Sequence, residues 1–187
     1  MASLGFVVEA EVCGWSGAGV WGAQTRSPRR SAGFAGRSIY EPSARQIGPF
    51  RVTAVPSHDW RGDDQVAWIV ESSDRRIIHC GDTIWHGGWY EIARRHPPFD
   101  AAFFPINGVI VRLDGFTPTD IPATLTPEQA IEAATILRAG KPCAIHHILF
   151  QSPPRYIEQP AAVERFLAAG TRRGINAIAP GEGERIW

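Results

Sequence analysis

Hydrophobic and polar residues follow regular patterns from about Gly48 to the end of the chain. Short, mainly apolar runs of strand length alternate with segments in which apolar residues recur with the period of a helix. The strands that this pattern predicts cover 50–55, 66–70, 76–80, 101–106, 143–146 and 175–179. The predicted helices cover 89–95, 126–139 and 160–169. This order of elements indicates a compact fold of the α/β (α+β) class.

The clearest helix signal begins at Thr126. A threonine in front of a helix accepts a hydrogen bond from an N–H group of its first turn, and Pro127 suits the first helical position. Gly140 is expected to end this helix. The apolar stripe that would face the core consists of Ile131, Ala134 and Leu137.

Turn residues and a proline predict where strands end. Ser72, Ser73 and Asp74 separate the strands 66–70 and 76–80, so these two strands are expected to form a hairpin. Pro56 lacks a backbone N–H group and is expected to stop the strand 50–55. The side chains that follow Pro56 should therefore leave the sheet.

The first 47 residues lack this order. Serine, glycine, alanine, tryptophan and arginine are mixed without a strand or helix period, and the run from Ser27 to Arg37 is almost entirely small or basic. We therefore expect residues 1–47 to form an irregular or disordered arm, and residues 48–187 to form the folded domain.

The composition narrows the functional class. The 187 residues carry a formal net charge of zero and 44% hydrophobic residues, which fits one domain and gives no attraction to nucleic acid or to a membrane surface. No stretch reaches the length of a membrane span, and the N-terminus lacks the basic start of a signal peptide. Three widely spaced cysteines form no disulfide framework, which favours a reducing cytoplasm. A small molecule is the expected partner.

Metal-capable side chains follow three of the predicted strands. His58 comes after the strand 50–55, Asp82 after the strand 76–80, and His146 closes the strand 143–146. Sheets with helices on their faces present ligands at such strand ends, and Gly81 allows a sharp turn before Asp82. Each residue also has an ordinary interpretation: a loop histidine, an aspartate in a simple turn, and a histidine of the core or the surface.

Two neighbouring features leave alternatives open. His146 and His147 are adjacent, so in a strand their side chains point to opposite faces and only one of them can join the other two candidates. A cysteine nucleophile beside a histidine is a further possibility, with Cys80 and Cys143 as the candidates. Both cysteines fall in apolar strands, however, where a thiol is usually inert.

Together these motifs resemble the later motifs of the metallo-β-lactamase superfamily. The segments that carry the resemblance are Ile-Gly-Pro-Phe-Arg-Val-Thr-Ala-Val-Pro-Ser-His-Asp, Ile-Ile-His-Cys-Gly-Asp-Thr, Leu-Thr-Pro-Glu-Gln-Ala and Ala-Ile-His-His-Ile-Leu-Phe. They are most similar to the branch that contains the L-ascorbate-6-phosphate lactonases. The resemblance runs from about Gln46 to Trp187. It implies part of a metallo-β-lactamase αβ/βα sandwich, an incomplete one, with a mixed β-sheet and outer helices.

The resemblance also implies a role for each candidate residue. His58 would bind the first of two metal ions, Asp82 would be the catalytic carboxylate that bridges both, and His146 would bind the second. His147 falls where relatives often have an aromatic residue and could contact substrate or serve as an alternative ligand. Apart from the resemblance, Trp85 and Trp89 flank His86 and could line a substrate pocket beside Asp82, or be aromatic residues of the core. Relatives use two zinc ions, sometimes manganese, and a metal-bound water that attacks an ester, lactone, amide or phosphoester bond.

One departure from the family pattern is large. The family's strongest motif, His-x-His-x-Asp-His, supplies most of the metal ligands, and it is absent from residues 1–57; the first histidine of the chain is His58. We therefore expect weak metal binding and impaired hydrolysis, and we expect that the chain begins late relative to its relatives.

Two functions follow as hypotheses. The first is a metal-dependent hydrolase with an incomplete metal site. The alternative is a non-catalytic half-domain that binds a partner or a small molecule. An incomplete sandwich would leave apolar sheet surface uncovered, so self-association, or completion by a second chain, is expected in both cases.

Overall fold

The computed structural model describes residues 44–147 and 151–187. Every strand and helix in these ranges belongs to one compact unit, Tyr40–Pro180, whereas Gly181–Trp187 belong to a second unit. The predicted arm, residues 1–47, lies outside the described residues except for its last four. Those four form a strand, so regular structure begins within the segment that shows no period in its sequence.

The main sheet has six strands, in the order β1-β2-β3-β4-β5-β7. Their bounds are β1 (Ala44–Ile47), β2 (Phe50–His58), β3 (Asp64–Glu71), β4 (Arg76–His79), β5 (Ala101–Pro105) and β7 (Pro142–Ile145). The strands from β1 to β4 pair antiparallel, and β4, β5 and β7 pair parallel. The sheet is therefore mixed, as predicted, and the β3–β4 hairpin is confirmed.

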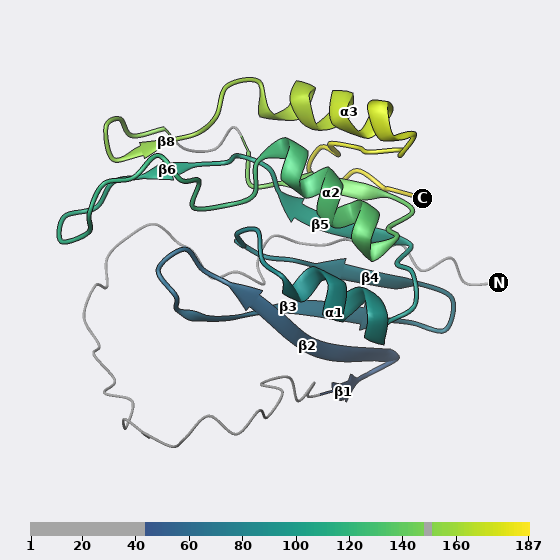
Figure 1. Cartoon of the computed structure of the whole chain (residues 1–187). Helices are drawn as coiled ribbons and strands as arrows, with labels where there is room; N and C mark the ends of the chain where they lie inside the picture. The colour runs from purple at the N-terminus through teal and green to yellow at the C-terminus, as the bar shows by residue number, and fades with distance from the viewer. Residues whose placement is uncertain (1–43, 148–150) are drawn as a thin grey trace, which may run out of the picture. The chain divides into compact units, whose positions relative to one another are not determined.

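Two short strands, β6 (Ile110–Val111) and β8 (Tyr156–Ile157), form a separate antiparallel ribbon. This ribbon extends beside the main sheet (Figure 1). It was not predicted, because strands of two residues are too short to show a period. The last predicted strand, 175–179, is reduced to a single parallel bridge between Cys143 and Ile178.

Three helices accompany the sheet: α1 (Gly88–Arg95), α2 (Pro127–Leu137) and α3 (Ala162–Arg173). Helices α1 and α2 lie side by side on one face of the sheet, and α3 packs along α2 (Figure 1). The capping of α2 is as predicted, because the Thr126 side chain accepts a hydrogen bond from Gln129 N–H while the Gln129 side chain accepts one from Thr126 N–H. No described helix is long and apolar enough to cross a membrane.

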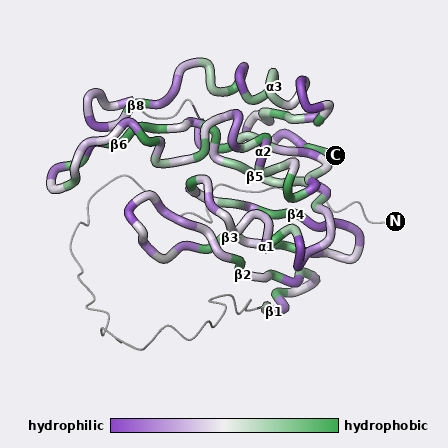
Figure 2. The backbone as a smooth tube through the Cα atoms, in the orientation of Figure 1, coloured by the Kyte–Doolittle hydropathy of each residue, from purple (hydrophilic) through white to green (hydrophobic). Residues whose placement is uncertain are grey.

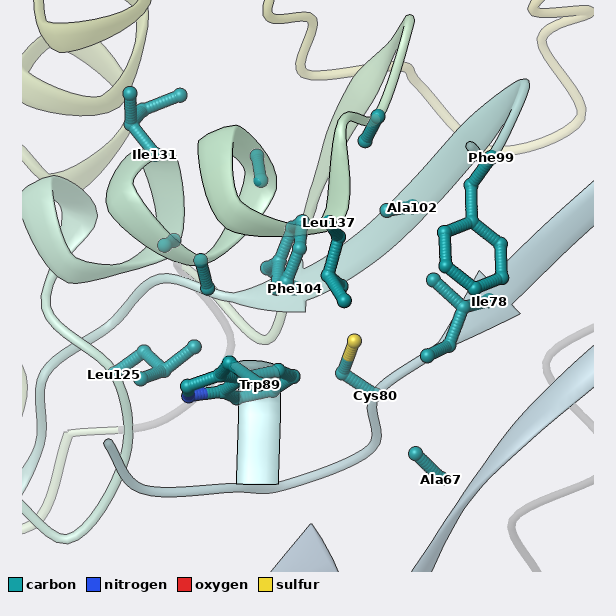
Figure 3. Packing of buried hydrophobic residues seen from close by; sticks show 14 of the residues in the cluster. Ala67, Ile78, Cys80, Trp89, Phe99, Ala102, Phe104, Leu125, Ile131 and Leu137 are labelled. Carbon is teal, nitrogen blue, oxygen red and sulfur yellow. The ribbon is translucent and has the colours of Figure 1, made fainter. Parts of the chain in front are cut away.

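The hydrophobic core lies between the sheet and these helices. Ile69, Ile78 and Phe104 are fully buried. Burial alternates along β3, where Ala67 and Ile69 are buried and Val66 and Trp68 are exposed, whereas all five residues of β5 are buried. Hydrophobic residues predominate along β5, whereas hydrophobic and hydrophilic residues alternate along α3 (Figure 2). Figure 3 shows Trp89 of α1 packed among core side chains that include Phe104 and Leu125.

Two predicted boundaries are wrong. β2 continues through Pro56 to His58, and Pro56 lies opposite Val66 of β3 within this pairing. Helix α2 ends at Leu137 rather than at Gly140. Arg138 takes the left-handed conformation there (φ 55°), and its guanidinium donates hydrogen bonds to the carbonyl groups of Ala93 and His96.

Candidate functional site

The strand directions bring the three predicted site residues to one edge of the sheet. β2 and β4 are both antiparallel to β3, so they run in the same direction, and β5 and β7 run parallel to β4. His58 is the last residue of β2, Asp82 follows β4, and His146 follows β7. The predicted ligands therefore leave the sheet at the edge where carboxyl ends of parallel strands meet.

Asp82 and His146 approach each other at this edge. Nδ1 of His146 lies 3.6 Å from a carboxylate oxygen of Asp82. This distance is that of an ion pair and is too long for a hydrogen bond. The His146 side chain is 37% exposed and that of Asp82 is 56% exposed. Both groups are therefore open to a solute while they remain next to each other.

Left-handed backbone conformations shape both turns. Gly81 has a φ of 66°, which glycine adopts without a steric cost, and His146 has a φ of 51°, which is costly for a residue with a Cβ atom. Non-glycine residues held in this region are enriched at functional sites. The N–H group of Gly81 also donates a hydrogen bond to His79 Nδ1 over 3.2 Å.

Thr83 connects the Asp82 turn to the end of β2. The hydroxyl of this fully buried residue lies 3.5 Å from the backbone nitrogen of His58 and 3.4 Å from its carbonyl oxygen. The Ile84 N–H group donates to the same carbonyl oxygen over 3.1 Å, and Leu125 N–H donates to Thr83 C=O over 2.9 Å. The His58 backbone is thus fixed to the two residues that follow Asp82.

The imidazole of His58 lies next to a second histidine. Its ring centre is 4.6 Å from that of His86, and the two rings are tilted by 59°. His86 in turn stacks on Trp89, with ring centres 4.2 Å apart. Burial, and then the neighbouring His58, lower the pKa of His86 to about 4. His86 is therefore a neutral imidazole at physiological pH.

A polar network lies at the same edge, after β5. Asn107 is buried; its side-chain nitrogen donates to the Tyr156 hydroxyl (3.0 Å) and to Glu158 (3.2 Å), and its oxygen accepts from Thr124 (2.5 Å). Burial raises the pKa of Tyr156, and the charges of Asp82 and Glu158 raise it further. Asn107 directly follows a predicted apolar strand, so the rule that selected Asp82 also points to Asn107.

His79 is another site residue that the sequence motifs did not single out. It is the residue before Cys80 in the segment His-Cys-Gly-Asp-Thr. Burial lowers its pKa, and the nearby His146 lowers it further. His146 therefore lies near enough to His79 to act on its imidazole.

The two predicted pocket residues differ in their surroundings. His147 is partly buried, and its Nδ1 atom has no hydrogen-bond partner among the residues that the structure describes. Burial lowers the pKa of His147, although the charge of Glu158 opposes this effect. Trp85 is 39% exposed on the loop between Asp82 and α1.

The cysteine alternative is disfavoured. Cys80 and Cys143 are both fully buried. Burial raises the pKa of the Cys143 thiol to about 12, and it raises that of Cys80 further. A nucleophilic cysteine needs a thiolate near neutral pH, so neither residue is suited to this role.

Comparison with known proteins assigns the family. A family model described as a beta-lactamase superfamily domain matches residues 21–147, which is more than half of the chain. The chain belongs to this superfamily. The match begins inside the segment 1–47. Among curated proteins, no sequence matches the chain.

Solved structures show that this superfamily member has the metallo-β-lactamase fold. YhfI of Bacillus subtilis, a metallo-beta-lactamase fold protein, is 12% identical with a TM-score of 0.55, covering 78% of this chain and 53% of its own. Igni18 of Ignicoccus hospitalis, a metallo hydrolase, is 18% identical with a TM-score of 0.56, and the match covers 81% of this chain and 59% of Igni18. The isothiocyanate hydrolase from Delia radicum gut bacteria is 14% identical with a TM-score of 0.57, and the match covers 81% of this chain and 58% of the hydrolase. The chain thus spans somewhat more than half the length of these relatives.

The metal centre that this fold implies is not complete in the described residues. Carboxylate and imidazole are ligand types that zinc prefers, and Asp82, His146 and His58 offer them. Within residues 44–147 and 151–187, however, no group of three or more histidine, cysteine, aspartate or glutamate side chains is arranged to hold a metal ion. The donor types fit zinc, and their number and arrangement do not.

Proposed function

We propose that the chain is a superfamily hydrolase that acts on an ester, lactone or phosphoester bond of a small molecule at the sheet edge of His58, Asp82 and His146. Within the superfamily, the sequence motifs favour the lactonase-like branch. We assign all three residues as the chain's metal ligands, and Asp82 also as the catalytic carboxylate. His147 and Trp85 are assigned to the substrate pocket.

The contact between Asp82 and His146 carries this proposal. Their segments are far apart in the sequence, both side chains are exposed, and Nδ1 of His146 lies 3.6 Å from the carboxylate. The contact thus places a carboxylate and an imidazole, two ligand types that zinc prefers, next to each other at the ends of β4 and β7.

Zinc, or manganese, is the metal that this site would use, and we expect it to bind weakly. A catalytic zinc site needs three protein ligands and a structural one four, whereas the described residues contain no group of three or more such side chains arranged to hold a metal ion. Activity should therefore be low compared with relatives that hold two metal ions tightly.

The alternative function is a non-catalytic half-domain that binds a partner chain or a small molecule. The incomplete set of metal ligands within the described residues favours it. A second chain that completed the ligand set would unite the two hypotheses.

Hydrolysis by the purified full chain tests the proposal. Chromogenic esters, lactones and phosphoesters would be assayed with added zinc or manganese and with a chelator. We expect slow turnover that the chelator reduces and that Asp82→Asn and His146→Ala abolish. Asp74→Asn and His96→Ala are matched controls, because Asp74 lies in the β3–β4 turn at the other end of β4 and His96 follows α1.

The controls should retain the activity of the unmodified chain. If no substrate of any of the three classes is hydrolysed, or if Asp82→Asn leaves hydrolysis intact, the catalytic proposal fails and the binding function is the better account.

A further inference from the structure

The orientation of the buried Asn107 side chain follows from its hydrogen-bond partners. Val109 N–H donates to the Thr124 hydroxyl over 3.2 Å, and this hydroxyl donates its own proton to the Asn107 oxygen. The amide nitrogen of Asn107 therefore faces the other way. It lies 3.0 Å from the Tyr156 hydroxyl oxygen and 3.2 Å from a carboxylate oxygen of Glu158. An ionised carboxylate only accepts hydrogen bonds, which agrees with a donor nitrogen at this position.

This network makes the Tyr156 hydroxyl a hydrogen-bond donor. Its oxygen accepts from the Asn107 amide, so the single proton of the phenol is directed away from Asn107. Burial raises the pKa of Tyr156, and the charges of Asp82 and Glu158 raise it further. The phenol therefore keeps its proton at neutral and mildly alkaline pH. A neutral donor that is held in place in this way is suited to stabilise a developing negative charge.

Strand order places this donor at the edge of the candidate site. In the sheet, β5 lies between β4 and β7, and Asn107 is the second residue after β5. Asp82 follows β4 and His146 follows β7, so Asn107 lies between them in the strand order. Asn107, and the Tyr156 hydroxyl that it holds, therefore share the edge at which Asp82 and His146 meet.

We propose that Tyr156 is a catalytic residue of this site: its hydroxyl donates a hydrogen bond to the carbonyl oxygen of an ester or lactone, and Asn107 is its positioning residue. The inference rests on the proposed function, to which it adds one residue and a narrower substrate class. An uncharged carbonyl compound is favoured over a phosphoester, because the carboxylates of Asp82 and Glu158, which both act on the hydroxyl, repel an anionic phosphate.

Hydrolysis leaves the proton of Tyr156 in place. As the oxygen of the attacking water bonds to the carbonyl carbon, an electron pair moves onto the carbonyl oxygen, and the hydrogen bond from Tyr156 strengthens. The electron pair returns when the bond to the leaving oxygen breaks, and the proton that the water loses ends on that oxygen. The hydroxyl therefore acts mainly in the transition state, so its loss should lower kcat with little effect on KM.

Steady-state hydrolysis by the full chain carrying Tyr156→Phe tests the inference, because phenylalanine keeps the ring and removes only the hydroxyl. The probe is the chromogenic ester or lactone that the unmodified chain hydrolyses fastest. We expect kcat to fall about 10²-fold, as for other donors to a developing oxyanion, with KM changed less than about twofold. Tyr90→Phe, at an exposed residue of α1, is the matched control and should leave both constants unchanged.

A double-mutant cycle separates positioning by Asn107 from a purely structural role. Asn107→Ala should lower kcat in the unmodified chain, because the Tyr156 hydroxyl loses the group that holds it. In the Tyr156→Phe background the same change should lower kcat little further, whereas a structural role would lower it equally in both backgrounds. Urea unfolding of each variant checks that the fold is kept. If Asn107→Ala does not fold, Tyr156→Phe alone decides the inference.

The outcomes distinguish this inference from the proposed function. If the unmodified chain hydrolyses esters or lactones and Tyr156→Phe keeps the same kcat, or Tyr90→Phe loses as much, the inference is overturned while the proposed function stands. A rise in KM alone, or a loss of kcat for phosphoesters alone, would also overturn it. If the unmodified chain hydrolyses no substrate, the proposed function fails and the inference fails with it.

Discussion

Asp82 and His146 meet because of the backbone conformation on which each depends. Gly81, with a φ of 66°, turns the chain after β4, and His146 itself takes a φ of 51° after β7. A left-handed conformation costs a residue with a Cβ atom about 1–2 kcal/mol. The strain at His146 is therefore maintained by the surrounding fold, and Gly81 avoids a similar strain.

Replacing Gly81 should harm the site more than the fold. We predict that Gly81→Ala lowers the free energy of unfolding by about 1–2 kcal/mol and reduces hydrolysis strongly, because it strains the turn that carries Asp82. Gly115, with a φ of 88°, is the matched control. Gly115→Ala should show the same loss of stability in urea unfolding and normal activity. Equal activity in both variants would contradict the role given to the Gly81 turn.

The buried thiols should be inert in the folded chain. Because burial raises the pKa of Cys143 to about 12 and that of Cys80 further, both are protonated near pH 8. We predict that an alkylating reagent at pH 8 leaves both unmodified in the native chain and modifies both in urea, as mass spectrometry of the peptides would show. Rapid native labelling of either residue would reopen the nucleophilic cysteine alternative.

Individual site residues differ in how far the sequence could predict them. Asp82 and His146 follow apolar strands, so their positions at the sheet edge follow from the strand order alone. Asn107 likewise follows an apolar strand, β5, and lies at the same edge of the sheet. His86 could not be found in this way, because its buried position depends on packing against Trp89 and Gly88. Among the described residues its ring nitrogens have no hydrogen-bond partner, which no sequence pattern shows.

At the scale of elements, residues close together in the sequence predicted where α2 begins but not where it ends. Thr126 caps α2 as predicted, and Gln129, three residues further on, completes the cap. The end of α2 depends instead on Arg138 reaching α1, which no local pattern shows. The extension of β2 through Pro56 to His58 likewise depends on its pairing with β3, in which Pro56 lies opposite Val66.

The α2–α3 contact contains an ion pair that should respond to pH. Arg165 donates to both carboxylate oxygens of Glu128 over 2.9 and 2.6 Å. Burial alone would raise the pKa of Glu128, but the hydrogen bonds from Arg165 and the backbone outweigh it and lower the pKa below its ordinary value. The pair therefore stabilises the chain above the pKa of the unfolded carboxyl and loses this effect as pH falls through the folded pKa.

A double-mutant cycle measures this contribution. We predict a coupling of at most about 1 kcal/mol between Glu128→Gln and Arg165→Gln at pH 7, because both side chains are partly exposed. The coupling should vanish once the pH lies below the folded pKa of Glu128. A coupling that stays constant across this range would show that the two residues interact through packing rather than charge.

At the scale of the whole molecule, the sheet is covered unevenly: one face is exposed on β3, whereas every residue of β5 is buried. Val66 is 45% exposed and Trp68 is 44% exposed, whereas their strand neighbours Ala67 and Ile69 are buried beneath the helices. We predict that the chain self-associates through this face, and that Trp68→Lys shifts sedimentation towards the monomer. Tyr90→Lys, on a 63% exposed residue of α1, is the control. A stable monomer at high concentration would contradict the prediction.

The fold family was predictable because its later motifs end successive strands in a fixed order, and that order survives in the sheet. The set of histidines at the candidate site was only partly predictable from the sequence. The absence of histidine before His58 can be read from the sequence, but the nearness of His79 to His146 and of His86 to His58 arises from packing between segments far apart in the chain.

Anomalous diffraction at the zinc absorption edge, from crystals of the full chain grown with Zn²⁺, tests the central claim most directly. The account predicts a zinc peak at the sheet edge, about 2.0–2.2 Å from an oxygen of Asp82 or from a ring nitrogen of His146 or His58. A zinc peak bound only elsewhere, such as at His96, or no peak at this edge at saturating zinc, would contradict it.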